Sequence, residues 1–378
     1  MRRFFYLALA ALQLLLLAGR GGVRGNYREL EQLLVIQTMG VDTRANGMTL
    51  SLAAKGDSKQ GVKRLKAAAS SMTAAMERIR LESFEEELFC AHIGQLLVGE
   101  KAAEAGLTDL LADLARSPDL RLDLPLYVVR EDTAEKAVAE VGDGSRGICD
   151  VMDTVRQSTL RRADCGETTA AQIDGDLKRY GAALICALRL VSAAEQEGEP
   201  GENTPLTAAP EGYGVLRDGK LCAYLTPEQA VAASFLKNET AAAEIPLRDS
   251  YGRTAVLETQ GGACRVTPVW GEGGQLTGLR IAAETACSVV EQGAAGDERT
   301  SDMLTARLEE YLARQIESVL RESRDLKADF LGLAARVERA DPAAYAALDR
   351  DFSELLPELE LEITVSARLR HMSDRKEM

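Results

Sequence analysis

Two groups of neighbouring carboxylates are the side chains that could carry acid–base chemistry. One group is Glu85, Glu86 and Glu87, and the other is Asp349 and Asp351. An enzyme could use such a pair as general acid and general base. Clusters of charge of this kind are, however, typical of solvated helix surfaces. We therefore expect no catalytic residue and a protein that is not an enzyme.

Histidine is too scarce for a histidine metal site or a Ser-His-Asp triad. The chain has two histidines, His92 and His371. His92 lies in the apolar sequence Phe89-Cys90-Ala91-His92-Ile93, which favours a hydrogen-bonded strand residue over a catalytic one. No CxxC pair occurs, so a structural zinc site is not indicated either. We expect no metal and no cofactor.

The seven cysteines are odd in number and widely scattered. Cys186 and Cys222 lie inside apolar runs, where a free thiol behaves as a small hydrophobic side chain. We expect free thiols rather than a disulfide framework, with pairing outside the cell as the alternative. The cysteines are Cys90, Cys149, Cys165, Cys186, Cys222, Cys264 and Cys287.

The first 20 residues are typical of an export signal. Arg2 and Arg3 precede a mostly apolar run that ends at Leu17 and is short for a membrane-spanning helix of about 20 residues. Leu17-Ala18-Gly19 begins the bacterial lipoprotein signal, but Arg20 stands where that signal has the lipidated cysteine. Three outcomes are open: a cleaved signal, an uncleaved marginal membrane helix, or another start or variant that supplies the cysteine.

Composition excludes some partners. The 59 acidic and 45 basic residues give a formal charge of -14, which opposes binding to nucleic acids and to anionic lipid headgroups. We expect no nucleic-acid partner, and contact with a membrane only through an anchor or a protein partner. About 350 residues remain after the signal, more than one hydrophobic core usually organises, so two or three domains are expected.

Residues 26–195 are expected to form a mixed α/β domain, because apolar β runs alternate with amphipathic helices. Asn46-Gly47 between two β runs predicts a hairpin. The predicted strands are 33–42, 48–53, 88–98, 122–129 and 182–191. The predicted helices are 70–81, 101–117 with a break at Gly106, 132–138, 147–160 and 168–179.

Residues 196–210, rich in proline and glycine, predict a linker to a second domain at 211–372, either single or divided into two subdomains near 295. That domain should contain a hairpin around Asp218-Gly219, several short strands between 243 and 290, and a long surface helix at 301–323. Strict alternation of apolar and polar residues predicts a half-exposed strand at 358–370. The fold class expected is α+β: several mixed α/β domains with antiparallel or mixed sheets and flanking helices.

Five short motifs follow one another in a particular order behind the export signal. They are Arg28-Glu29 with Gly40 and Asp42, then Gly99-Glu100, Arg116 with Arg121, Asp218-Gly219, and Asp329-Phe330 with Gly332. In this order they resemble the Ger(x)C family of spore germination lipoproteins, the C subunits of nutrient germinant receptors.

The resemblance implies a non-enzymatic subunit held by its lipid at the outer face of the cytoplasmic (spore inner) membrane. It also implies integral-membrane A and B subunits as partners. No small-molecule ligand is implied, because the nutrient is thought to be recognised mainly by the B subunit in that family. With Arg20 in place of the cysteine, no thioether to lipid can form at that position. The alternative function is an extracytoplasmic solute-binding receptor with a ligand cleft between the two domains.

Overall fold

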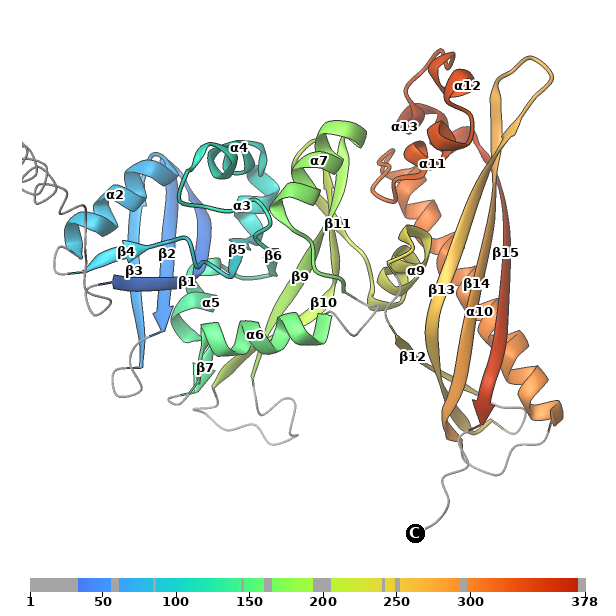
Figure 1. Ribbon diagram of the computed structural model, residues 1–378, viewed down its shortest axis with the longest axis horizontal. Coiled ribbons are helices and arrows are strands. Elements are labelled where there is room, and N and C mark those ends of the chain that lie inside the picture. Colours follow the sequence, from blue (N-terminus) through green and yellow to red (C-terminus); the bar gives the residue numbers. More distant parts are fainter. Residues whose placement is uncertain are drawn as a thin grey trace, which may run out of the picture.

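The computed structural model describes residues 33–55, 61–83, 86–143, 146–159, 165–192, 205–239, 242–248, 252–292 and 298–372. The expected export signal, Arg28, Glu29, Glu85 and most of the predicted linker lie outside these residues. The described chain forms an N-terminal and a C-terminal part that lie side by side along the long axis of the molecule (Figure 1).

A nine-stranded mixed sheet organises the N-terminal part. Its order is β11-β10-β9-β6-β5-β1-β2-β3, with β4 beside β1 and off this path. The four central strands β9, β6, β5 and β1 are parallel, and antiparallel strands extend the sheet at both ends. The strands are β1 (Leu33–Arg44), β2 (Gly47–Lys55), β3 (Val62–Ala69), β4 (Glu87–Phe89), β5 (Gln95–Gly99), β6 (Leu126–Arg130), β9 (Ala182–Ser192), β10 (Leu206–Arg217) and β11 (Lys220–Tyr224).

Helices cover both faces of this sheet, because parallel neighbours must be joined by crossovers. One face packs against α2 (Met72–Glu82), α3 (Glu100–Ala105), α4 (Thr108–Arg116) and α7 (Ala170–Tyr180). The other face packs against α5 (Ala134–Glu140) and α6 (Ile148–Thr159), next to the small ribbon β7 (Gly142–Asp143) and β8 (Arg146–Gly147). The core strands are therefore apolar on both sides, as the continuous run of β9 shows.

The C-terminal part is a four-stranded sheet with helices on one side. Its order is β12-β13-β14-β15, and β15 is parallel to β14 whereas the other pairs are antiparallel. The strands are β12 (Ala243–Arg248), β13 (Thr254–Trp270), β14 (Leu276–Gln292) and β15 (Glu360–Met372). The helices are α9 (Pro227–Lys237), α10 (Glu298–Asp325), α11 (Leu333–Ala340), α12 (Pro342–Ala346), α13 (Phe352–Leu355) and the 3-10 turn η2 (Leu356–Glu358).

The α+β class with mixed sheets and flanking helices is confirmed, and three predicted details differ. The strand predicted at 88–98 is two strands, β4 and β5, separated by a turn at 90–94. The short strands predicted between 243 and 290 include two strands of 17 residues each, β13 and β14. The last strand has the predicted alternation, but it pairs in parallel, which requires the crossover that α10 to α13 supply.

The sheets divide the chain later than the predicted boundary at 196–210. Strand β10 pairs with β9 from Leu206 onward, and β11 pairs with β10, so residues up to Tyr224 complete the N-terminal sheet. Pro210 lies at a register shift between β10 and β9, a place where a strand tolerates proline. Helix α10 shares one core with strands that precede and follow position 295 in the chain.

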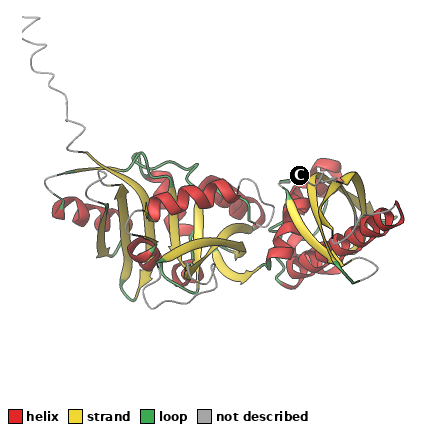
Figure 2. Ribbon diagram, turned by 90° about the horizontal axis from the view of Figure 1, so that it is seen from below, coloured by secondary structure: helices red, strands yellow, loops and turns green. Residues whose placement is uncertain are grey.

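One apolar core joins the two parts. Leu184 and Tyr213 of the large sheet pack in the same buried cluster as Leu236 of α9 and Phe330 before α11. An interface built from buried apolar side chains restricts relative motion of the parts it joins. Figure 2 shows the two parts, each with its own sheet and helices, from a second direction.

Candidate functional site: helix caps and the domain junction

Asp42, at the carboxyl end of β1, caps helix α5. Its two carboxylate oxygens accept hydrogen bonds from the backbone N–H groups of Ala134 at 2.9 Å and Glu135 at 2.7 Å. These are orphan donors of the first helical turn, and a carboxylate also suits the positive end of the helix dipole. Burial raises the pKa of Asp42, while the two backbone hydrogen bonds act in the opposite direction.

Gly40 and Gly99 make room for this cap. A Cβ on Gly99 would lie 2.0 Å from Oδ1 of Asp42, and one on Gly40 would lie 3.1 Å from Cβ of Ala134. Three predicted motif residues therefore meet at one point, although they come from two strands. Together these three residues hold the start of α5 against the ends of β1 and β5.

Glu100, which follows the central strand β5, forms a hydrogen bond with the edge strand β11 of the large sheet. Oε1 of Glu100 accepts a hydrogen bond from the Tyr224 hydroxyl at 2.8 Å, and the guanidinium of Arg130 lies 4.6 Å from the centroid of the Tyr224 ring. Arg130 in turn pairs with Glu211 at 3.3 Å. Burial and then the hydrogen bond with Glu100 raise the pKa of Tyr224. The sequence did not predict a role for Tyr224, Arg130 or Glu211, because the residues that each contacts are distant in the chain.

The Asp218-Gly219 hairpin turn packs against the start of α4. Both residues have positive φ, 51° and 78°, which is typical of a two-residue hairpin loop. The Gly219 carbonyl accepts a hydrogen bond from the Leu107 N–H at 2.8 Å, and a Cβ on Gly219 would lie 2.4 Å from Oγ1 of Thr108. Close contact as well as backbone conformation therefore requires glycine here.

Asp329 repeats the Asp42 arrangement in the C-terminal part. Its side chain is only 2% exposed, and its two oxygens accept the N–H groups of Leu333 and Ala334, each at 2.8 Å. Burial raises the pKa of Asp329 to about 6, against the lowering effect of these two backbone hydrogen bonds. Gly332 has φ of 66° where the chain turns into α11, and Phe330 is buried in the shared core.

A cavity of about 320 Å³ lies at the junction of the two parts. Its lining comes from α7, from the β10–β11 turn and from the α11–α13 region, namely Arg179, Tyr180, Gly181, Asp218, Asp329, Ala334, Tyr345, Asp351, Phe352 and Ser353. Arg179 pairs with Glu338 across the junction at 2.7 Å. Beside the cavity, Arg217 donates a hydrogen bond to the Leu326 carbonyl at 2.9 Å. Asp218 and Asp329 therefore line the same cavity, which the sequence did not predict.

The remaining motif residues, Arg116 and Arg121, lie on the surface. Arg116 pairs with Asp113 at 2.6 Å on its own helix, and Arg121 forms a two-point contact with Asp123. Side chains this exposed contribute little to stability through such pairs. Arg116 and the cap residue Asp42 line the same cavity of about 390 Å³.

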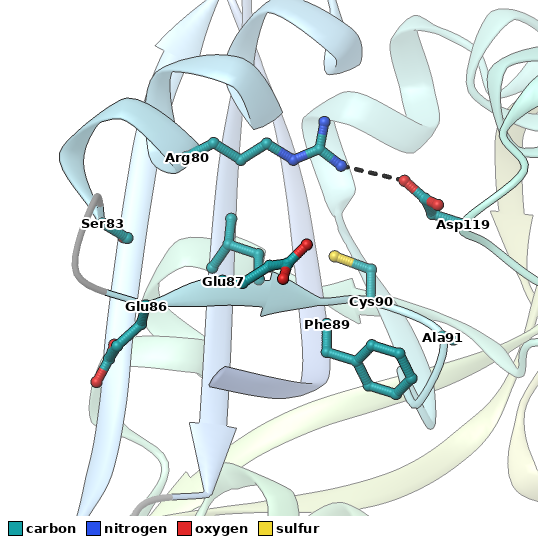
Figure 3. Close-up of a pocket in the computed structure, with 9 residues that line it drawn as sticks. Arg80, Ser83, Glu86, Glu87, Phe89, Cys90, Ala91 and Asp119 are labelled. Atoms are coloured by element: carbon teal, nitrogen blue, oxygen red, sulfur yellow. Dashed lines mark hydrogen bonds and ion pairs between the residues drawn. The ribbon is translucent and has the colours of Figure 1, made fainter. Parts of the chain in front are cut away.

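The described carboxylates considered for acid–base chemistry lie at the surface, and Glu85 lies outside the described residues. Glu86 is bound to Lys63, Glu87 is exposed, and Asp349 and Asp351 are exposed. Figure 3 shows Glu86 and Glu87 on the wall of a cavity of about 460 Å³, together with Arg80, Asp119 and the buried Cys90 thiol. Arg80 and Asp119 form an ion pair at 3.1 Å across it. Burial raises the pKa of Cys90, which disfavours a reactive thiolate.

One cysteine expectation was wrong. Cys186 is not a free thiol, because it forms a disulfide with Cys165, 21 residues earlier in the chain. Its position in an apolar strand concealed the partner, which lies in the segment before α7. Cys222 is free and exposed, and His92 lies exposed in the turn after β4, with its ring 5.3 Å from that of Phe89, rather than in a strand.

Among the described residues, no group of three or more His, Cys, Asp and Glu side chains could hold a metal ion. None of the helices in this part of the chain has both the length and the apolar character needed to cross a membrane.

The comparisons with known proteins identify the family. Residues 26–144 match the family model described as the spore germination protein N-terminal domain, and residues 211–373 match the one described as spore germination B3/GerAC like, C-terminal. The C-terminal model begins inside β10, as our predicted domain did.

A solved structure described as the crystal structure of the GerBC protein matches 88% of this chain and 97% of its own, with 16% identity and a TM-score of 0.58, so the fold is shared. No curated protein matches the chain. The two family models together span most of the sequence, and the chain belongs to the Ger(x)C, or GerAC-like, family of spore germination proteins.

Proposed function

We propose that this protein is the C subunit of a nutrient germinant receptor and works by assembling with integral-membrane A and B subunits. The observation that carries this proposal is the match of both family models, in order, along the chain. We also propose that it acts at the outer face of the cytoplasmic membrane. The apolar run behind Arg2 and Arg3 supports export, and so does the Cys165–Cys186 disulfide, a bond that persists in oxidising compartments.

The placement of the motif residues favours an assembly role over catalysis. The buried motif carboxylates, Asp42 and Asp329, each accept two backbone N–H groups at a helix start. Their oxygens hold helices in position. A rigid body made of two packed parts is suited to holding neighbouring subunits in a defined arrangement.

Deletion and complementation test this function. Spores that lack the gene should lose the response to the nutrients of one receptor, and the wild-type gene should restore it. A Phe330→Ala variant, which removes a ring from the core shared by the two parts, should restore it poorly if the arrangement of the parts matters. A normal response of the deletion strain to every nutrient would count against the proposal.

The cavity at the domain junction is the one observation that favours the alternative, a solute-binding receptor. Such receptors usually close around a ligand by a hinge motion. Here the shared apolar core opposes a hinge. A thermal-shift screen of amino acids and sugars separates the two functions, because only the solute receptor should gain stability with the logarithm of ligand concentration.

A further inference from the structure

Strand β15 forms one edge of the C-terminal sheet. In the described part of the chain it is the last of the four strands, beside β14. Figure 1 shows it on the side of this sheet that faces away from the N-terminal part, so that part does not cover the edge. Its pairing with β14 is regular from Glu360 to Leu369, and no proline or glycine interrupts this stretch. Proteins commonly use such interruptions to keep an edge strand from pairing with another chain.

The backbone of β15 offers hydrogen bonds at this edge. The Ala367 N–H donates to Oε1 of Glu309 on α10 at 2.9 Å, so the backbone polar groups of Ala367 point away from β14. Along a regular strand, every second residue directs its N–H and C=O to the same side. Leu361, Ile363 and Val365 therefore share the orientation of Ala367. Together they present the row of donors and acceptors that an added strand can use.

The apolar side chains of β15 are only partly covered by its own sheet. Leu361, Ile363, Val365 and Leu369 are half-buried, whereas the four residues opposite them on β14 are buried. A further strand would remove more of this apolar surface from water if its own apolar side chains continued the layer. A suitable partner has an apolar residue at every second position, and β15 itself meets this requirement.

The outward face of β15 carries a charge pattern that changes sign along the strand. Two acidic residues come first, two hydroxyl residues follow, and two basic residues come last. In chain order these exposed residues are Glu360, Glu362, Thr364, Ser366, Arg368 and Arg370. Opposite charges and paired hydroxyl side chains stabilise neighbouring strands, whereas like charges directly opposite each other destabilise them. The pattern is therefore complementary to itself when two copies run antiparallel.

One register satisfies every position of this pattern. Antiparallel pairing centred on Val365 sets Glu362 opposite Arg368 twice and Glu360 opposite Arg370 twice, with the two hydroxyl residues opposite each other. A centre one residue away, at Thr364 or Ser366, keeps two of these four Glu–Arg pairs. A centre between two residues sets exposed side chains opposite half-buried ones, which a sheet with one buried face disfavours. A parallel arrangement in register sets Glu362 against Glu362.

Local charge does not oppose this contact. The exposed charged side chains described on the outward face of β14 and β15 balance: Arg280, Arg368 and Arg370 against Glu284, Glu360 and Glu362. Glu362 already pairs with Arg280 of its own chain at 2.8 Å, but its side chain is 63% exposed and can meet a second arginine. The charge of -14 on each copy is spread over the whole chain, and physiological salt screens it beyond about 8 Å.

We infer that two copies of this chain associate by antiparallel pairing of β15 with β15, centred on Val365, to form one continuous sheet from the two C-terminal sheets. In the pair, the Ile363 carbonyl of the second copy replaces Glu309 as the acceptor of the Ala367 N–H. The two-fold axis is perpendicular to the sheet, so the helices of both copies lie on the same side of it. This inference goes beyond the proposed function and does not depend on it.

Reversal of one charge tests the pairing in solution. The full-length chain in mild detergent is followed by sedimentation at rising protein concentration, and we expect a monomer–dimer equilibrium. Glu362→Arg alone, or Arg368→Glu alone, should raise the dimer dissociation constant about 30-fold, because two stabilising cross-strand pairs become repulsive. Arg265→Glu is the matched control: Arg265 is exposed on β13, away from the edge, and its reversal should leave the constant nearly unchanged.

A mixture of the two reversed chains gives the sharpest comparison. Glu362→Arg in one copy faces Arg368→Glu in the other, and the native residues at the remaining two positions also have opposite charges. The mixture should therefore form a heterodimer about as readily as the wild-type chain forms its dimer, although neither variant pairs with itself. Association in the mixture also shows that both variants are folded.

Cysteine cross-linking tests the register, with Cys222→Ser removing the exposed native thiol. A mixture of Thr364→Cys and Ser366→Cys chains should form a disulfide, because facing residues of a non-hydrogen-bonded antiparallel pair have Cα atoms about 4.5 Å apart. A monomer at every concentration, reversed chains that associate like wild type, or a mixture that stays monomeric would overturn the inference. Cross-linking mainly within one variant alone, or to a different protein in solubilised membranes, would also overturn it, since the register or the occupant would be another.

Discussion

Replacement of Asp329 by asparagine should change how stability depends on pH. The carboxyl is 2% exposed and has a pKa of about 6, against an ordinary value of 3.8. Because the folded-state pKa is raised, the native state prefers the protonated acid. The stabilisation relative to an ionised group is complete below pH 4 and is lost as the pH rises through about 6. Two pH units correspond to about 3 kcal/mol.

The asparagine variant removes this titration and keeps an oxygen that can accept one N–H of α11. The free energy of unfolding of wild type minus that of Asp329→Asn should therefore fall by about 3 kcal/mol between pH 3 and pH 8. In a chain of this length such a change moves the melting temperature by about 4 °C. Denaturant titrations at five or six pH values, followed by circular dichroism, measure it directly.

Phe330→Ala is the matched control, since it weakens the same segment without changing a titratable group. Its difference from wild type should stay constant with pH. A flat difference for Asp329→Asn would refute the claim that burial dominates. A difference that rises with pH would mean that the two N–H groups of α11 hold the carboxylate more strongly than burial disfavours it.

Three further changes test other parts of the structure. Cys165→Ser, or reduction of the Cys165–Cys186 bond, should lower the free energy of unfolding by about 3 kcal/mol, the loop entropy of a 21-residue closure, as measured by melting with and without reductant. Gly99→Ala should lower the free energy of unfolding by about 2 kcal/mol, because the added Cβ would displace the Asp42 carboxylate that caps α5. The rate of backbone amide hydrogen exchange should rise first in α5. Unchanged protection of the α5 amides would contradict the role of Asp42 as a cap. Arg179→Ala should change stability by less than about 1 kcal/mol, because its ion pair is exposed, whereas Phe330→Ala should lower it by about 3 to 5 kcal/mol. Equal effects of these last two would refute the role given to the shared core.

Local patterns allowed most helices and strands to be predicted. The alternation in β15 and the Asn46-Gly47 hairpin are both signals carried by neighbouring residues. Asp329 acts on N–H groups four and five residues later, so its role is also a local one. The role of Asp42 is not local, because the two N–H groups that it accepts lie 92 and 93 residues away in the chain.

The features that were not predicted share this cause. Strand β10 joins the large sheet through pairing with β9, and the composition of residues 196–210 gives no sign of that pairing. The Cys165–Cys186 bond joins an apolar strand to a segment without periodic pattern. The cavity at the junction collects residues from α7, the β10–β11 turn and α11 to α13. Tertiary contacts decide each of these features, and no local pattern encodes them.

Assembly is the central claim, and purification from membranes tests it most directly. The full-length protein, tagged at its C-terminus and produced at its native level, is purified from detergent-solubilised spore membranes, and co-purifying proteins are identified by mass spectrometry. We predict recovery of one integral-membrane A subunit and one integral-membrane B subunit in constant ratio to the tagged chain, with neither recovered from a strain that carries the tag on an unrelated exported protein. Recovery of the tagged chain as a free monomer, with no membrane subunit under mild detergent, would contradict the account.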